Sequence, residues 1–232
     1  SVVGAAVSVP LTLLLTLTHL PTAVLGHGGA GKTALLQAID RGAAPVQGEM
    51  PRLDSTIGID AASEQVVAAF HQLAPPANAS EKVDLSIYDF AGQLEYLSTH
   101  QFFISTARTV ALILIDVSLP VDQQKRHLDH WLGMLCSQMP RAVPGGKSPY
   151  RVQLVLTKAD LLSHPIASAR AADLQREANK QVHLCWTDSV LLVSNKSGVG
   201  VRQLAQRVQQ AASAVLADMG QAILVPKYDG VG

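Results

Sequence analysis

Short apolar runs rich in β-branched residues alternate along the chain with longer amphipathic stretches. This alternation favours β-α-β units, in which helices join the parallel strands of one sheet. The pattern predicts strands at Thr22–Gly26, Lys82–Asp89, Val110–Val117, Val152–Thr157 and Val190–Ser194. It predicts helices from the loop after the first strand to about Arg41, and at Asp122–Met139, Ile166–Gln181 and Val201–Asp218. Gly220 stands where a glycine would end the last helix.

The segment between the first helix and the Lys82 strand has a weaker pattern. Ala43–Ser55 contains two prolines and a glycine and has no clear period, which predicts a mobile loop. Ile57–Ile59, extended by Gln65–Leu73, is consistent with a strand. Ala74–Ser80 then predicts a turn, so we expect one antiparallel hairpin in an otherwise parallel sheet.

The N-terminal segment is unusual because its first 31 residues carry no charged side chain. A buried or truncated lead-in, a membrane-contacting segment and a cleaved signal are the three alternatives. Pro10 divides the apolar run, and the Thr/Leu alternation of Leu11–Leu17 is typical of a strand. Residues 1–20 are therefore an apolar lead-in of uncertain role.

Composition narrows the class of protein. Lys plus Arg balance Asp plus Glu at 18 each, and 48% of residues are hydrophobic. This excludes intrinsic disorder and gives no basic face for nucleic acid. Cys136 and Cys185 form no C-x-x-C pair, which favours reduced thiols in a cytoplasmic protein, with membrane association left open by the lead-in.

The strongest local signal is a glycine-rich loop between the first predicted strand and helix. Its sequence satisfies G-x-x-x-x-G-K-[ST], a loop whose backbone N–H groups surround phosphate oxygens at a helix N-terminus. Within it, Lys32 is placed to reach the β- and γ-phosphates, and the Thr33 hydroxyl to ligate Mg²⁺. The expected phosphate-binding residues are Gly26, His27, Gly28, Gly29, Ala30, Gly31, Lys32 and Thr33.

Two further segments fit a site for the γ-phosphate. Asp89-Phe-Ala-Gly-Gln93 follows a predicted strand and matches the D-x-x-G pattern of GTPases. Here Asp89 would hold Mg²⁺, the Gly92 N–H would contact the γ-phosphate, and Gln93 would orient the attacking water. Thr56, in the loop before the second strand, would close over Mg²⁺ and the γ-phosphate. Arg52 is a candidate for a catalytic arginine in cis, with a solvent-exposed loop arginine as the alternative.

The segments at the ends of two predicted strands are candidates for binding the base of the nucleotide. Thr157-Lys158-Ala159-Asp160 resembles N-K-x-D, in which the aspartate accepts hydrogen bonds from guanine N1 and N2 and so rejects adenine. Thr157 replaces the usual asparagine, and the alternative for Asp160 is a helix N-cap. The last strand ends in Ser194-Asn195-Lys196, which resembles the S-A-K loop near guanine O6, with Asn195 in place of alanine.

Together these segments resemble the Roc domain, the Ras-like GTPase module of Roco proteins. The similarity rests on Gly26–Thr33, on Ser55–Asp60 and above all on Tyr88–Gln93 followed by Glu95–His100, and it covers about residues 22–218. The resemblance implies a three-layer α/β P-loop fold, with a mostly parallel six-stranded sheet and helices on both faces. It implies GTP/GDP binding with Mg²⁺, slow GTP hydrolysis and a signalling role.

The resemblance also implies a larger protein. Residues 21–218 would form the GTPase domain, and 219–232 would begin the linker to a COR-like domain through which the protein would dimerise. The effectors, the hydrolysis rate, the oligomeric state and the other domains do not follow from this sequence.

Two alternatives remain. Gly26–Gln37, with Ala34 directly after the loop, also resembles the P-loops of NB-ARC and NACHT ATPases, and Asp116 would then hold Mg²⁺ at the end of a Walker B strand. The other alternative is a nucleotide-binding scaffold with negligible hydrolysis.

Several aromatic residues have no predicted role in this chemistry. Trp131 and Trp186 are expected to be core or interface anchors, and His127 and His130, on the Asp122–Met139 helix, to face solvent or to be packed. His19 and His27 lack metal-ligand partners at useful spacing.

Overall fold

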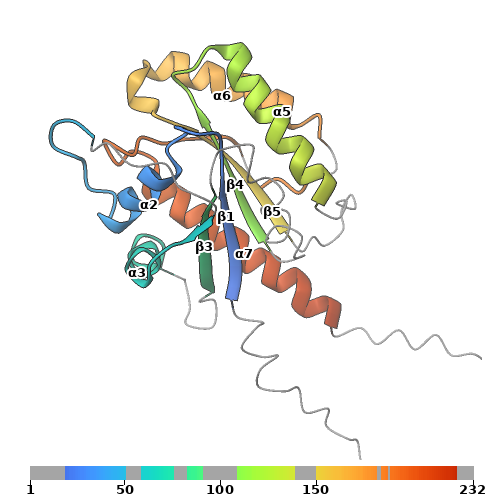
Figure 1. Cartoon of the computed structure of the whole chain (residues 1–232). Helices are drawn as coiled ribbons and strands as arrows, with labels where there is room; N and C mark the ends of the chain where they lie inside the picture. The colour runs from blue at the N-terminus through green and yellow to red at the C-terminus, as the bar shows by residue number, and fades with distance from the viewer. Residues whose placement is uncertain are drawn as a thin grey trace, which may run out of the picture.

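The computed structural model contains one six-stranded sheet with helices on both of its faces, as predicted (Figure 1). It describes residues 19–50, 59–75, 83–90, 109–138, 150–181, 184–187 and 189–223. The strand order is β2-β3-β1-β4-β5-β6, and only the β2–β3 pair is antiparallel among the described strands. The strands are β1 (His19–Leu25), β2 (Ile59–Ala61), β3 (Asp84–Phe90), β4 (Thr109–Asp116), β5 (Tyr150–Thr157) and β6 (Leu191–Leu192).

Two helical layers cover the sheet. One face carries α2 (Lys32–Asp40), α3 (Glu64–Leu73) and α7 (Val201–Ile223), and the other carries α5 (Val121–Gln138) and α6 (His164–Ala178). Strand β4 lies at the centre and is buried along its whole length, as its unbroken apolar sequence predicts. The helices α5 and α6 bury Leu128, Trp131, Leu132, Leu135 and Leu174 against their face.

The extension of the second strand to Gln65–Leu73 was wrong. These residues form helix α3, whose first turn is capped by the Ser63 hydroxyl accepting the Val66 N–H at 3.4 Å. Phe70 and Leu73 are buried, and with Val66 they recur at the three- and four-residue spacing of a helix face. The antiparallel pairing itself is confirmed, but α3 lies between β2 and β3, so the connection is not a tight hairpin.

The end of the last helix was also predicted too early. Helix α7 continues through Gly220 to Ile223. Its apolar face, which includes Val201, Leu204, Val208 and Val215, packs on the sheet and holds the helix in place. A single glycine inside a packed helix costs only about 1 kcal/mol relative to alanine, so it does not by itself end one.

The parallel strands bring their carboxyl ends to one edge of the sheet. Asp116 at the end of β4 pairs in register with Thr157 at the end of β5, and Asp89 near the end of β3 lies beside β1. The described loops that follow β1, β5 and β6 therefore meet at this edge, next to Asp89 of β3, and open α/β sheets bind their ligands at such an edge. Within the part of the chain that is described, no helix has the length and apolar content needed to span a membrane.

Candidate functional site

The glycine-rich loop turns the chain sharply between β1 and α2. A Cβ on Gly26 would lie 2.8 Å from the Leu114 carbonyl oxygen of β4, so only glycine permits this close approach. Gly31, at φ +87°, takes the left-handed conformation directly before α2. The first N–H groups of α2 have no acceptor within the helix and make its N-terminus a site for anions.

Lys32 places its ammonium group over the same loop. Its Nζ donates to the Gly26 carbonyl at 2.8 Å and to the His27 carbonyl at 3.2 Å, and the residue is only 6% exposed. Burial lowers the pKa of Lys32 from its ordinary value, and the Asp89 carboxylate acts in the opposite direction. The structure therefore holds a buried ammonium group against two carbonyls of the glycine-rich loop.

Thr33 and Asp89 form a pair of oxygen donors beside that cation. The Thr33 Oγ1 donates to Asp89 Oδ2 at 2.5 Å, and Asp89 is 2% exposed. The two residues are far apart in the sequence, and they meet because β3 lies next to β1 in the sheet. A hydroxyl and a carboxylate are ligands that suit Mg²⁺.

Asp116 has a different set of partners. Its Oδ2 accepts from the Lys158 Nζ at 2.5 Å, and its Oδ1 accepts from the Ser118 N–H and hydroxyl at 2.8 and 2.6 Å. Asp116 is 6% exposed, so this ion pair is largely shielded at the carboxylate end. The aspartate that contacts the P-loop threonine is Asp89, as the GTPase interpretation predicts.

The Thr157–Asp160 loop and the Ser194–Lys196 loop are the two candidates for binding the guanine base. Both contact the glycine-rich loop Gly26–Thr33, called the phosphate loop below. The Thr157 Oγ1 donates to the Ala30 carbonyl at 2.7 Å, and the Asn195 Nδ2 donates to the Gly31 carbonyl at 3.0 Å. Both residues are buried, at 0% and 6% exposure. The sequence predicted Thr157 and Asn195 to bind the base; the structure shows both in contact with the glycine-rich loop.

Asp160 lies close to these contacts and is exposed. It sits in the short 3-10 helix η3 (Ala159–Leu161), which Lys158 precedes in the left-handed conformation at φ 58°. Ser163, not Asp160, is the N-cap of α6, so the helix-cap interpretation of Asp160 is not supported. Among the described residues the Asp160 carboxylate has no hydrogen-bond or ion-pair partner.

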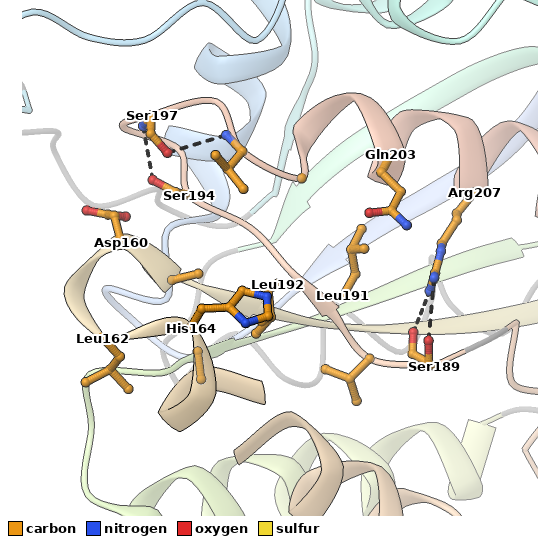
Figure 2. Close-up of a pocket in the computed structure, with 15 residues that line it drawn as sticks. Asp160, Leu162, His164, Ser189, Leu191, Leu192, Ser194, Ser197, Gln203 and Arg207 are labelled. Atoms are coloured by element: carbon orange, nitrogen blue, oxygen red, sulfur yellow. Dashed lines mark hydrogen bonds between the residues drawn. The ribbon is translucent and has the colours of Figure 1, made fainter. Parts of the chain in front are cut away.

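Figure 2 shows a pocket that begins at Asp160 and continues along the edge strand β6. Its volume is about 510 Å³, and it ends near Ser189, whose carbonyl accepts from the Arg207 guanidinium. None of Gly26–Thr33 lines this pocket. Ser194, from the loop after β6, also lines the pocket, and the Ser194 hydroxyl accepts the Ser197 N–H at 3.0 Å. The pocket thus extends away from the phosphate loop.

The loop that follows β6 is itself braced by the segment after α2. The Arg41 guanidinium donates to the Asn195 carbonyl at 2.9 Å, and the Val46 N–H donates to the Lys196 carbonyl at 2.7 Å. Lys196 keeps its side chain exposed. Nothing in the sequence pattern pointed to Arg41, because its partner lies 154 residues further along the chain.

Helix α5 covers the other side of the phosphate loop with aromatic rings. His27 stacks on His127 with ring centroids 3.6 Å apart, and the Trp131 Nε1 donates to the His27 Nδ1 at 3.1 Å. His130 meets His27 edge to face at 5.1 Å. His127 and His130 thus pack on the loop rather than on their own helix alone. Trp131 is confirmed as a core residue, at 2% exposure.

The indole contact defines the state of the His27 ring. Because Nδ1 accepts from Trp131, the neutral ring carries its proton on Nε2. Burial lowers the pKa of His27 to about 4, and the imidazoles of His127 and His130 and the Lys32 ammonium add to this effect. Burial also lowers the pKa values of His127 and His130. Within the described part of the chain, no three His, Cys, Asp or Glu side chains lie close enough together to hold a metal ion by themselves.

Some predicted residues lie outside the described residues. They are Thr56, Gly92, Gln93, Arg52 and the segment Glu95–His100. The described part of the site therefore consists of the phosphate loop, Asp89 and the two loops after β5 and β6.

Comparison with known proteins agrees with this geometry. Residues 22–160 match the family model described as "Roc: Ras of Complex, Roc, domain of DAPkinase". The chain is 38% identical over 92 residues to the probable serine/threonine-protein kinase roco5 of Dictyostelium discoideum, covering 40% of this chain and 3% of that protein. It is 32% identical over 127 residues to leucine-rich repeat serine/threonine-protein kinase 1 of Caenorhabditis elegans, covering 55% of this chain and 5% of that protein.

A solved structure shows the same fold in a protein of distant sequence. The bacterial selenocysteine-specific elongation factor EF-Sec aligns with a TM-score of 0.56 at 18% identity, over 83% of this chain and 28% of that one. The chain thus spans a small part of each of these proteins. The family match, by contrast, covers more than half of the chain. The chain therefore belongs to the Roc family, and it is a GTP-binding domain of the kind found in Roco-type proteins.

Proposed function

We propose that this domain binds GTP and GDP together with Mg²⁺ and slowly hydrolyses GTP, as a switch within a larger signalling protein. The observation that carries the proposal is the convergence of three elements at one sheet edge. They are the phosphate loop with the buried Lys32, the Thr33–Asp89 pair, and the Thr157–Asp160 loop, which touches the phosphate loop through Thr157.

The phosphate end of the nucleotide would lie in the loop before α2. The N–H groups there and the Lys32 ammonium supply positive charge to the β- and γ-phosphates. Lys32 now donates to two carbonyls of the loop, so its ammonium would exchange those contacts for phosphate oxygens. A buried cation gains more from such an exchange than an exposed one, because little water competes for it.

The residues at the metal position suit Mg²⁺. Thr33 Oγ1 and the Asp89 carboxylate are hard oxygen donors 2.5 Å apart, and Asp89 is nearly fully buried. These two residues would hold the ion on the phosphate side of β3. Bound there, Mg²⁺ would offset the negative charge that develops on the phosphate oxygens.

Asp160 would bind the guanine base and select it over adenine. Its carboxylate is exposed and is not used by the cap of α6. Guanine offers two N–H donors to one carboxylate, whereas adenine leaves the carboxylate without that pair, which favours guanine by some kcal/mol. The Lys158 stem would lie over the base plane, and the ion pair with Asp116 fixes its far end.

The proposed reaction is in-line attack by water on the γ-phosphorus. The bond from the γ-phosphorus to the β,γ-bridging oxygen breaks, and GDP and inorganic phosphate leave. Gln93 would orient the water, while Gly92 and Thr56 would contact the γ-phosphate. These assignments rest on the D-x-x-G-Q pattern and the loop threonine of the sequence.

The ATPase alternative has less support. It requires Asp116 to face the metal, but this carboxylate is bonded to Lys158 and Ser118, and Thr33 bonds Asp89 instead. We further propose that residues 219–232 lead into a COR-like domain through which the protein forms a homodimer.

Single-turnover hydrolysis of GTP tests the enzymatic part of the proposal. The wild type is expected to convert bound GTP slowly, and Gln93→Leu to be slower by about 10- to 100-fold with GDP affinity unchanged. Asn179→Ala, at the exposed end of α6, is the control. Equal rates for wild type and Gln93→Leu would leave a nucleotide-binding scaffold as the function.

A further inference from the structure

Two consecutive carbonyl groups of the phosphate loop are held from outside the loop. The Ala30 carbonyl accepts from the Thr157 hydroxyl at 2.7 Å, and the Gly31 carbonyl accepts from the Asn195 side-chain amide at 3.0 Å. The Gly31 carbonyl also accepts the Leu35 N–H at 2.9 Å, which is the first hydrogen bond of α2. The loop is therefore anchored by two side chains that come from two different strand ends.

These anchors set the direction of the N–H groups in the same peptides. In a planar trans peptide the C=O and N–H bonds point in opposite directions. The described chain contains no cis peptide bond. Holding the Gly31 carbonyl toward Asn195 thus turns the Lys32 N–H away from Asn195. The Thr157 contact does the same for the Gly31 N–H.

Asn195 is fixed in its own position and is nearly inaccessible. It is 6% exposed, and its backbone carbonyl accepts from the Arg41 guanidinium at 2.9 Å. Its side chain touches Gly31 so closely that a Cβ on Gly31 would lie 3.0 Å from the Asn195 Nδ2. A rigid support and a short contact are what a residue needs to orient a peptide group.

The residue type matters here because the resembling S-A-K loop has alanine at this place. Alanine carries no side-chain donor, so it cannot hold the Gly31 carbonyl. This chain also has Thr157 where N-K-x-D has an asparagine. The side-chain amide that the N-K-x-D asparagine would supply at the end of β5 is thus supplied here by Asn195, on the loop after β6.

We propose that Asn195 is a positioning residue of the phosphate loop, which holds the Gly31 carbonyl so that the Lys32 N–H faces the β-phosphate of the nucleotide. The proposal rests on the proposed function for the presence of a nucleotide. The sequence predicted that the Asn195 segment contacts the guanine base; the proposal instead assigns the Asn195 side chain a role in binding the phosphates. The backbone of the same loop stays available to the base.

The test compares the affinities for GDP and for GMP in the presence of Mg²⁺. Both ligands share the guanine base and the ribose, but only GDP has a β-phosphate. We expect Asn195→Ala to weaken GDP binding by about five- to tenfold, the usual effect of one lost hydrogen bond. GMP binding is expected to weaken by less than about twofold.

A second variant separates the donor from the packing. Asn195→Leu keeps the number and branching of the side-chain heavy atoms and lacks the donor, so it is expected to show the same selective loss for GDP. Asn179→Ala, an asparagine exposed at the end of α6, is the matched control and is expected to bind both ligands as the wild type does. A thermal unfolding scan of each variant shows that the compared samples are folded.

Each other outcome has a distinct meaning. Equal losses for GDP and GMP would place the Asn195 side chain at the base and overturn the proposal, as would unchanged GDP affinity in both variants. If the wild type itself bound no GDP, the proposed function would fail instead, so the two failures are distinguishable.

Discussion

The two sides of the phosphate loop are built from different chemistry. On the side of β5 and β6, the Thr157 hydroxyl and the Asn195 amide hold the Ala30 and Gly31 carbonyls. On the side of α5, the Trp131 indole and two imidazoles, those of His127 and His130, pack around the His27 ring. Neither of the two anchoring side chains on the first side titrates, whereas the cluster on the second side consists mainly of imidazoles, which do. The same loop is thus held by pH-independent contacts on one side and by a pH-sensitive cluster on the other.

This difference assigns the two sides different roles. The β5–β6 side fixes peptide directions and is expected to act on nucleotide affinity. The α5 side buries aromatic area and is expected to act mainly on stability, with a dependence on pH. Three substitutions separate these effects, beginning with the residue that lies between the two sides.

Lys32→Ala is expected to have the largest effect. The ammonium lies over the loop that both sides support, and Lys32 is the only Lys or Arg among loop residues 26–33. Its loss is expected to weaken GDP binding by more than about 100-fold, because a buried charge-assisted contact with phosphate disappears. Nucleotide content after purification and calorimetric titration measure this. Lys180→Ala, whose ammonium pairs with Glu177 on the surface, is the control. Normal GDP affinity in Lys32→Ala would overturn the site.

Thr157→Val tests the β5–β6 side. Valine keeps the shape of this fully buried residue but leaves the Ala30 carbonyl without its hydroxyl donor. We expect about tenfold weaker GDP binding, equally at every pH between about 6 and 8, because no titrating group is removed. Titrations at both ends of that range measure it. The matched control is Thr187→Val, which removes the hydroxyl bonded to the Gln153 side chain. A loss confined to acidic pH would contradict the assignment.

His27→Asn tests the α5 side and is expected to have the smallest effect. An imidazole has an ordinary pKa of 6.5, and the pKa of His27 is about 4 in the fold. Between these values the unfolded state binds the extra proton. Stability is therefore fully present above pH 6.5 and is lost as the pH falls towards 4.

The measurement is chemical denaturation of wild type and variant at neutral and mildly acidic pH. Because the ring is only partly buried, we expect His27→Asn to reduce the acid-induced loss of unfolding free energy by at most about 1 kcal/mol. His164→Gln, exposed at the start of α6, should leave that loss unchanged. An identical pH dependence in wild type and His27→Asn would show that the cluster is not a titrating support.

The sequence predicted the parts of this structure that depend on local pattern. The phosphate loop, the strand ends at Asp89 and Thr157, and the mostly parallel sheet all follow from short motifs and from alternating strands and helices. Helix α3 was missed because Gln65–Leu73 is apolar enough to be consistent with either period over so short a stretch.

The remaining features depend on contacts between distant residues. The His27–Trp131 bond joins residues 104 apart, and Asn195 reaches Gly31 across 164 residues. Neither spacing has a motif, so no pattern in a single sequence predicts them. A signal did exist at one of these places, because Asn195 departs from the alanine of the resembling loop.

The central claim is that a guanine nucleotide binds at the phosphate loop while Asp160 selects its base. The most direct measurement is competition against a fluorescent GDP by GDP, ADP and xanthosine diphosphate, for the wild type and for Asp160→Asn. We expect the wild type to prefer GDP to both other nucleotides by at least about 100-fold, and we expect Asp160→Asn to shift the preference towards xanthosine diphosphate. Equal displacement of the wild-type complex by ADP, or an unchanged preference for GDP in Asp160→Asn, would contradict this claim.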